Sequence, residues 1–275
     1  MRNIFNYVER SSPIHRLTGA TKLVCLLLWS FAAMTSYDTR LLAVLTVLCV
    51  PLFAVSRIRV SDVSFMLGFT LVFMALNNVL VFVFAPQHGV SIYGTCHVIA
   101  DLGGRWLITK EQLFYHLNQM LKCFALVPAV LIFVCTTQPS EFASSLNRIG
   151  VPYSVAYSVA LALRYIPDIQ QEYHEISQAQ QARGIEMSKK ESLGKRLKAA
   201  SAILIPLILS SMDRIETISN AMELRGFGKH KKRSWYMARP FRAADFLAIA
   251  FCVLVCAAAV YLNHLNGSRF WNPFV

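Results

Sequence analysis

Long apolar stretches separated by short charged segments dominate the chain. Val63–Ala85 contains 23 residues without a charge, and Leu117–Cys135 and Asp245–Leu262 are similarly apolar. A helix needs about 20 mostly apolar residues to cross a bilayer. Leu23–Tyr37 and Leu41–Val55 have 15 residues each, and small or uncharged flanking residues extend both. The pattern predicts five transmembrane helices.

A different pattern, apolar and then polar, occurs twice between the fourth and fifth predicted spans. Tyr153–Ile166 and Ala199–Met212 are apolar but have only 14 residues each, too few to span. We therefore expect them to be buried against other helices or to lie at the membrane interface. Pro167 follows the first run and Pro206 interrupts the second, so each helix is predicted to have a hinge there.

Both helices are predicted to end in the same way. Gln181-Ala182-Arg183-Gly184 closes the first and Glu223-Leu224-Arg225-Gly226 closes the second. Glycine readily adopts the left-handed conformation that caps a helix C-terminus. An arginine there lies at the negative end of the helix dipole and presents five donors. Either end alone is an ordinary C-cap, but two on consecutive helices indicate paired contacts with a two-fold partner. Ends lying far apart, buried, or on opposite membrane sides would contradict that pairing.

Several shorter features complete the pattern. Pro86–Thr109 is predicted to be an outward loop with a hairpin, closed by a Thr109–Gln112 capping box. The histidines of this loop are too irregularly spaced to favour a metal site. Lys122, near the outer end of the fourth span, is expected to reach the interface. Ser154, Ser158 and Ala162 form a row of small residues that allows another helix to approach closely.

These elements divide the chain into three regions. Residues 1–136 are expected to hold four transmembrane helices and an outer loop over 86–116. Residues 137–242 form a cytosolic or interfacial region, in which Thr137–Pro152 is a short helix preceding the two long ones. Residues 243–275 contain the last span and an outer tail. The fold class is therefore an all-α polytopic membrane protein.

Composition and charge support this interpretation. Hydrophobic residues make up 55% of the 275 positions and charged residues only 15%, which is atypical of a soluble domain. The net charge is +12, yet the 137–242 region mixes 16 basic with nine acidic side chains. Nucleic-acid binding is therefore disfavoured. Of the 27 lysines and arginines, 22 lie in segments predicted to be inside, which indicates a cytosolic N-terminus and an external C-terminus.

The chain lacks the motifs of common membrane-bound catalysts. No G-x-x-x-x-G-K-[ST] sequence occurs, so ATP binding through a P-loop is excluded. His174 and Glu175 begin a near match to a zincin motif, but Gln178 replaces the second histidine ligand. The strong spans also lack the buried ionisable residues typical of a proton-coupled carrier. No metal or cofactor is expected to be bound, and the driving energy must come from elsewhere.

The arrangement resembles the T component of energy-coupling factor (ECF) transporters, the membrane scaffold of a class of ABC importers. Ser12–Leu17 and Thr21–Leu23 resemble the family's N-terminal signature, with Gly19-Ala20 where Pro-Arg is usual. Thr137–Pro152 resembles its first coupling helix. The segment ending in Ala182-Arg183-Gly184 matches the first Ala-Arg-Gly motif, and Leu224-Arg225-Gly226 matches the second with leucine in place of alanine.

The resemblance implies a fold and a mechanism. About five transmembrane helices would be joined to an L-shaped set of three coupling helices in the plasma membrane of a prokaryote. Two ATPase subunits, identical or different, would bind ATP and Mg²⁺. Each would receive one of the arginines, Arg183 or Arg225. Closure of the ATPases would be transmitted through the two proline hinges to a membrane-embedded substrate-binding (S) subunit, which carries a vitamin, metal ion or similar micronutrient. The small-residue row would pack against that subunit.

Two alternatives from other classes remain open. A polytopic membrane enzyme would use Glu172, His174 and Glu175 for acid–base chemistry at the interface. A secondary carrier would transport its substrate without partner proteins. The scaffold predicts co-purification with two ATPases, the enzyme predicts loss of function in His174→Ala, and the carrier predicts uptake by the reconstituted chain alone. The sequence does not identify the cargo, the number of S subunits served, or which arginine meets which ATPase.

Overall fold

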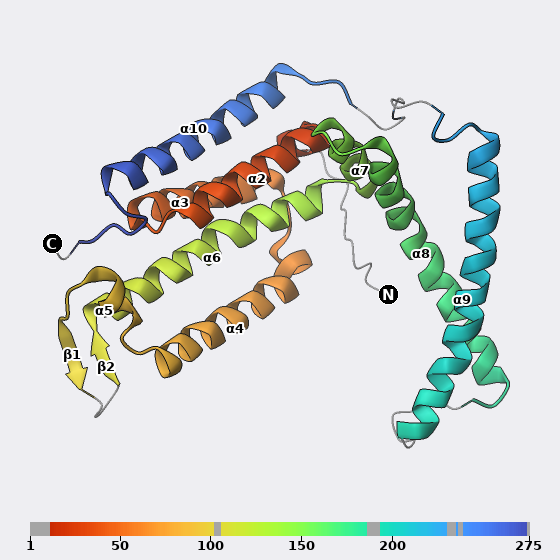
Figure 1. Cartoon of the computed structure of the whole chain (residues 1–275), viewed down its shortest axis with the longest axis horizontal. Helices are drawn as coiled ribbons and strands as arrows, with labels where there is room; N and C mark the ends of the chain where they lie inside the picture. Colours follow the sequence, from red (N-terminus) through yellow and green to blue (C-terminus); the bar gives the residue numbers. More distant parts are fainter. Residues whose placement is uncertain (1–11, 102–105, 186–192, 230–234, 236–238, 274–275) are drawn as a thin grey trace. The chain divides into compact units, whose positions relative to one another are not determined.

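The computed structural model describes residues 12–101, 106–185, 193–229, 235 and 239–273 (Figure 1). The chain divides into two compact units. The first comprises residues 1–145 together with 239–275, and the second comprises residues 146–238. The first unit contains most of the apolar helices and the second contains the two long helices with polar ends. Each unit is described separately below.

The first unit is a helical bundle with a small hairpin at one end. Its short elements are α1 (Pro13–Arg16) and α5 (His88–Tyr93), together with antiparallel strands β1 (Val98–Asp101) and β2 (Leu107–Thr109). The strands confirm the hairpin predicted in this loop. The long helices are α2 (Gly19–Thr35), α3 (Thr39–Ser56), α4 (Val60–Phe84), α6 (Lys110–Thr136) and α10 (Ala243–Leu265).

Four of these helices, namely α3, α4, α6 and α10, are long and apolar enough to cross a membrane, whereas α2 has only 17 residues. However, α2 runs parallel to α10 along nearly its whole length. Thr18 N donates to Asp245 Oδ1 at 2.8 Å, and Cys256 Sγ donates to Leu28 O at 2.9 Å. At the far end, Asn263 Nδ2 donates to Thr35 O at 3.4 Å. The helix α2 therefore lies alongside α10 over most of its length, and its role as the fifth predicted crossing stays a prediction.

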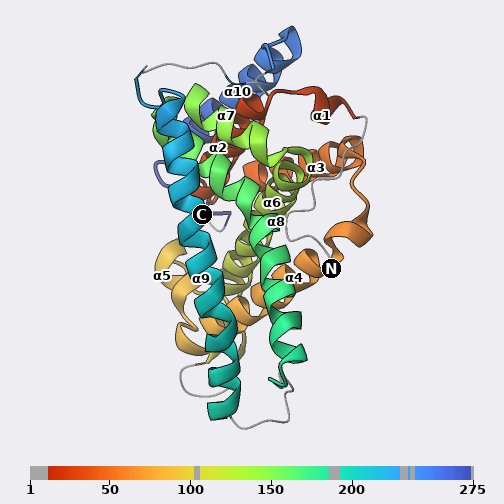
Figure 2. The same ribbon diagram turned by 90° about the vertical axis from the view of Figure 1, so that its right-hand side faces the viewer.

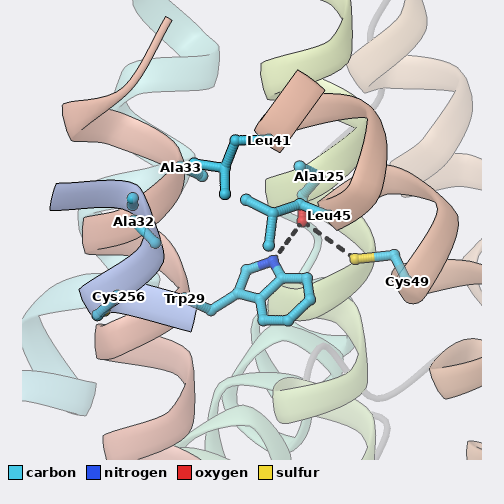
Figure 3. Close-up of a cluster of buried hydrophobic side chains, with 9 residues drawn as sticks. Trp29, Ala32, Ala33, Leu41, Leu45, Cys49, Ala125 and Cys256 are labelled. Atoms are coloured by element: carbon cyan, nitrogen blue, oxygen red, sulfur yellow. Dashed lines mark hydrogen bonds between the residues drawn. The ribbon is translucent and has the colours of Figure 1, made fainter. Parts of the chain in front are cut away.

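The centre of the bundle lies where α2, α3, α6 and α10 meet (Figure 3). The Trp29 indole Nε1 and the Cys49 thiol both donate to the carbonyl oxygen of Ala125, at 3.0 and 3.2 Å. Small residues such as Ala32 and Ala33, both fully buried, allow the helices to approach closely around the indole. The indole N–H and the thiol at this point are therefore both satisfied by the protein itself, as an apolar surrounding favours.

The hairpin end of the bundle corrects two expectations. Lys122 is 6% exposed and does not extend to the interface. Its Nζ donates to Met34 O at 3.0 Å and lies 3.2 Å from the centroid of the Tyr37 ring. Thr109 caps α6 by accepting from Gln112 N, but the Gln112 side chain accepts from Gly89 N rather than completing a capping box. Both side chains therefore bond to residues that are distant in the sequence, Lys122 to Met34 and Gln112 to Gly89.

The second unit is built from α8 (Tyr153–Ala182) and α9 (Leu193–Leu224), which lie side by side (Figure 2). Both helices continue through their internal prolines, Pro167 and Pro206. The preceding helix, α7 (Pro139–Arg148), lies where a short helix was predicted over Thr137–Pro152, and its residues divide between the two units. The described elements are thus almost entirely helical, as the sequence predicted.

Candidate functional site

The first Arg-Gly end, Ala182–Gly184, closes α8 with a double hydrogen-bonded cap. Gly184 N donates to Gln181 O at 3.0 Å, and Ile185 N donates to Gln180 O at 3.1 Å. Gly184 has φ of +86°, the left-handed conformation expected there. These bonds satisfy the last carbonyls of the helix and turn the backbone sharply away. The arginine is therefore the last side chain presented by the helix before the turn.

The second Arg-Gly end, Leu224–Gly226, has the same geometry on α9. Gly226 N donates to Glu223 O at 2.8 Å, and Phe227 N donates to Met222 O at 2.9 Å. Gly226 has φ of +66°. Both caps are Schellman motifs, with an apolar residue directly after the glycine. The similarity noticed in the sequence is therefore a similarity of backbone structure.

Both Arg-Gly ends present accessible side chains. Arg183 and Ala182 are exposed at the first, and Arg225 is exposed at the second. Leu224 is 89% exposed, although it is a large apolar residue. An arginine flanked by an accessible apolar side chain combines charge-assisted bonding with apolar burial, a combination common in protein interfaces. The requirement that both ends be exposed is met.

The requirement that the two ends lie close together is not met. Gln180 Nε2 donates to Ala202 O at 3.2 Å near one end of the pair, and the Tyr157 ring lies 4.9 Å from the Phe227 ring near the other. The helices are therefore antiparallel, and the second Arg-Gly end lies beside the start of α8. The 26 residues from Tyr157 to Arg183, at 1.5 Å per residue, separate the two ends by about 40 Å. No single groove can receive both.

A polar contact fixes α8 against α9 in the middle of the pair. The Glu172 carboxylate accepts from Arg214 Nη2 at 2.7 Å and from the hydroxyl of Ser210. The Glu172 side chain is only 16% exposed, because it faces Arg214 on α9. The carboxylate is committed to a structural ion pair. This removes one of the three groups required by the enzyme hypothesis.

The other two groups of that hypothesis lie on the exposed surface of α8. His174 Nε2 lies 3.1 Å from Gln178 Nε2, and Glu175 Oε1 accepts from Gln171 Nε2 at 2.9 Å. Both are contacts one helical turn apart, as expected for a solvated helix face. Among the described residues no group of three histidine, cysteine, aspartate or glutamate side chains is placed to bind a metal.

An aromatic cluster surrounds the residue that follows the second Arg-Gly end. Phe227 lies 5.9 Å from Tyr153 and 4.9 Å from Tyr157, measured between ring centroids. The Trp235 ring lies 5.2 Å from the Tyr153 ring, tilted by 52°, and its Nε1 donates to Asn147 Oδ1 at 3.1 Å. The cluster links the second Arg-Gly end directly to the start of α8 and the end of α7. The sequence analysis missed it, because its aromatic members form two groups, Tyr153 with Tyr157 and Phe227 with Trp235, that are 70 or more residues apart in the sequence.

The row of small residues lies on an accessible face of the second unit. Ser154, Ser158 and Ala162 are all exposed. The Ser158 hydroxyl donates to Ser154 O at 3.0 Å within the helix, so its polar group is satisfied without an outside partner. The face is therefore available for close packing against another helix. That it meets an S subunit stays a prediction.

In the first unit, buried polar contacts fix the start of α7 to the bundle. The Glu141 carboxylate accepts from Gly19 N at 2.9 Å, and Glu141 is 5% exposed. A Cβ on Gly19 would lie 2.6 Å from Ser145 Oγ and 2.8 Å from Glu141 Cγ. Only glycine therefore allows α2 and α7 to approach this closely. Gly19 is one of the two residues, Gly19-Ala20, at which this chain differs from the Pro-Arg usual in the N-terminal signature, and it is the residue that makes this contact.

The same end of the bundle is joined by two further contacts. Lys22 Nζ donates to Thr136 O at 2.8 Å, which links α2 to the last turn of α6. Asp245 accepts from both Thr18 N and Arg242 N at 2.8 Å, which links the starts of α2 and α10. The N-terminal signature thus serves as a junction of α2, α6, α7 and α10.

Comparison with known proteins agrees with these features. The family model described as "CbiQ: Cobalt transport protein" matches residues 10–235. A protein of Bacillus selenitireducens named "Energy-coupling factor transporter transmembrane protein EcfT" is 27% identical over 96% of this chain and 98% of its own length. A protein with the same name from Listeria innocua is 27% identical over 96% of this chain and 96% of its own length. Another, from Bacillus subtilis, is 23% identical over 94% of this chain and 97% of its own length. The chain therefore belongs to the CbiQ family of cobalt transport proteins, as an EcfT-like transmembrane T component of an energy-coupling factor transporter.

Proposed function

We propose that this T component transmits the closure of two ATPase subunits to a membrane-embedded S subunit, and is not itself catalytic. ATP and Mg²⁺ would be bound by the ATPases. The cargo, a vitamin, metal ion or similar micronutrient, would be bound by the S subunit. The observation that supports this most is that both long helices end in matching Arg-Gly caps whose arginines are exposed. The ~40 Å between the caps contradicts the expectation that they lie close together, so the proposal requires a separate groove for each arginine.

The separation of the two caps suits two adjoining ATPases. A domain of roughly 250 residues has a radius of gyration of about 18 Å, and so a diameter of about 45 Å. Equivalent grooves on two adjoining domains of that size, related by a two-fold axis, can be spaced by any distance up to about two diameters, and the ~40 Å between Arg183 and Arg225 falls within that range. Each arginine therefore meets its own subunit, and the helix pair connects the two.

The contacts within the pair allow it to transmit force. The Glu172–Arg214 ion pair and the Gln180 bond to Ala202 O fix α8 against α9 at two levels. When the ATPases close, the ends would be pulled as parts of one connected element. Pro167 and Pro206, which lie inside the two helices, remain the proposed hinges. The accessible row of Ser154, Ser158 and Ala162 remains the proposed packing surface for the S subunit.

In this proposal the N-terminus is cytosolic and the C-terminus external. The end of the bundle that contains Arg16, Arg57 and Arg242 would face the cytosol. The hairpin of β1 and β2 would lie outside, close to the C-terminal tail. Asn272 Nδ2 donates to Tyr93 O at 3.0 Å, so the tail and the loop helix α5 lie at the same end of the bundle.

The test uses charge reversal in the full transporter. Arg183→Glu and Arg225→Glu are each expected to weaken ATPase binding by 30-fold or more, because truncating one partner of a buried charged pair costs about 2–5 kcal/mol. The double variant should release both ATPases from the membrane while remaining folded. Co-purification of the ATPases with the tagged chain and ATP-driven uptake provide the two measurements.

Matched controls separate a specific contact from a general effect of charge. Lys198→Glu changes the charge equally on an exposed residue near the first Arg-Gly end, and Lys229→Glu does so near the second. Both should retain the ATPases. If the double arginine variant still binds both ATPases and transports normally, or if the lysine variants lose them equally, the proposed contacts are wrong.

A further inference from the structure

An apolar cavity of about 400 Å³ lies inside the first unit, between α2, α3, α6 and α10. Its walls include Leu26, Leu52, Ile132 and Phe251, one from each of these helices. Cavities of this volume fall within the range that binds small ligands, about 300–1,000 Å³. Because the walls are almost wholly apolar, the part of a ligand that enters must be apolar too.

A second depression adjoins this cavity at the same end of the bundle. Three arginines from separate segments line it: Arg16 after α1, Arg57 after α3, and Arg242 before α10. All three are exposed. Leu17 lines both the basic depression and the apolar cavity, so the two adjoin at this side chain. An elongated molecule that displaces the Leu17 side chain would occupy both.

The charge of the depression favours an anion. Among the described residues that line it, the one carboxylate is that of Asp245, which is 1% exposed and accepts from Thr18 N and Arg242 N. It is therefore hydrogen-bonded to the backbone of the bundle. Guanidinium groups present paired donors that match a phosphate geometrically. Lys22 also lines the apolar cavity, where its Nζ donates to Thr136 O.

We infer that this composite site binds one anionic phospholipid, with its phosphate among Arg16, Arg57 and Arg242 and an acyl chain in the apolar cavity. A soluble anion would use the arginines but leave the apolar space empty. A zwitterionic lipid would fill the cavity but gain less from three guanidinium groups. The site lies at the end of the bundle assigned to the cytosolic leaflet, whose anionic lipids attract basic segments.

The test measures lipid retention by the purified full chain. The protein is reconstituted in vesicles that contain phosphatidylglycerol and phosphatidylcholine in equal amounts, extracted, and analysed by native mass spectrometry. The wild type is expected to retain one phosphatidylglycerol in strong preference to phosphatidylcholine. Arg16→Gln and Arg242→Gln should each reduce that preference about fivefold, the effect of one basic residue near an anionic surface. The double variant should lose most of it.

Two further variants distinguish the parts of the site. Ala248→Phe places a ring in the apolar cavity and should reduce retention of both lipids, while the arginines remain. Arg40→Gln removes an equal charge at the opposite end of the bundle, where Arg40 lies 4.1 Å from the Trp271 ring, and should change nothing. Thermal unfolding of each variant confirms that it folds.

Three results would overturn the inference. Full preference for phosphatidylglycerol in the folded Arg16→Gln/Arg242→Gln double variant would remove the role of the arginines. An equal loss of that preference in Arg40→Gln would indicate a general effect of charge. Complete displacement of the lipid by inorganic phosphate at millimolar concentration would assign the depression to a soluble anion.

Discussion

Replacing Gly19 with alanine should damage the junction between α2 and α7 although the change adds only one methyl group. Gly19 is the first residue of α2, and its N–H donates to the buried Glu141 carboxylate. The new Cβ would lie 2.6 Å from Ser145 Oγ, 2.8 Å from Glu141 Cγ and 3.2 Å from Glu141 O. Because the backbone oxygen belongs to α7 itself, rotation of side chains cannot relieve all three contacts. The two helices must move apart.

The magnitude follows from two opposing effects. Adding a methylene to a well-packed site costs about 1–3 kcal/mol. Alanine in a helix is favoured over glycine by up to ~1 kcal/mol, which offsets part of this cost. If the separation also breaks the bond from Gly19 N to the Glu141 carboxylate, a further ~1.5–3 kcal/mol is lost. We expect the free energy of unfolding to fall by about 1–3 kcal/mol.

The matched control is Gly68→Ala in α4. Gly68 is also helical, and no described heavy atom lies within 4 Å of the position of its Cβ. The same substitution should therefore be neutral or stabilising by up to ~1 kcal/mol. Both variants are measured by denaturant unfolding of the purified chain in mild detergent, monitored by circular dichroism. ATP-driven uptake in the full transporter reports whether α7 still functions.

A rescue variant tests the mechanism. Ser145→Ala removes the nearest atom, so the Gly19→Ala/Ser145→Ala protein should regain part of the lost stability. The reasoning is refuted if Gly19→Ala proves as stable as Gly68→Ala. It is also refuted if the effects of Gly19→Ala and Ser145→Ala on the free energy of unfolding are simply additive, because residues in direct contact are expected to show coupling.

Three further predictions concern the second unit. Gly184→Ala and Gly226→Ala place a side chain on backbone with φ of +86° and +66°, so each should destabilise its helix cap by ~1 kcal/mol. Each should reduce ATPase co-purification clearly while changing the melting temperature of the chain little. Glu172→Gln and Arg214→Met should show a coupling free energy of about 0.5–3 kcal/mol in a double-mutant cycle of unfolding, and additive effects would contradict the ion pair. Phe227→Ala should reduce ATP-driven uptake while Arg225 still binds its ATPase, whereas an unchanged uptake rate would show that the aromatic cluster is not needed for transmission.

The apolar pattern along the chain predicted most of the fold because it depends on local sequence. Uncharged runs such as Val63–Ala85 became helices with nearly the expected bounds, and the glycines after Arg183 and Arg225 adopted the expected conformation. Contacts between distant residues left no comparable signal. Glu141 lies within the short helix predicted over Thr137–Pro152, but nothing in the sequence indicates its partner, which is 122 residues away.

The same difference explains the errors at individual side chains. Lys122 was assigned to the interface because long basic side chains commonly extend there. The structure provides a carbonyl from α2 and the Tyr37 ring instead, so the ammonium group is satisfied inside the bundle. Glu172 was assigned to solvent by helical spacing, but it faces Arg214 on α9. Neither partner can be identified before the helices are placed side by side.

The two Arg-Gly ends have the same cap but unequal connections to the rest of the chain, which bears on how force is transmitted. A displacement of Arg225 reaches the start of α8 within two residues, through Phe227 and Tyr157. A displacement of Arg183 must travel about 40 Å along α8, past the Glu172 contact, before it reaches the same place. In the proposed mechanism the first end would therefore act through a longer path than the second. Movements of the two ends in opposite directions would rotate the helix pair rather than shift it, and a rotation is the motion that the proposal requires to tilt a protein packed against its exposed face.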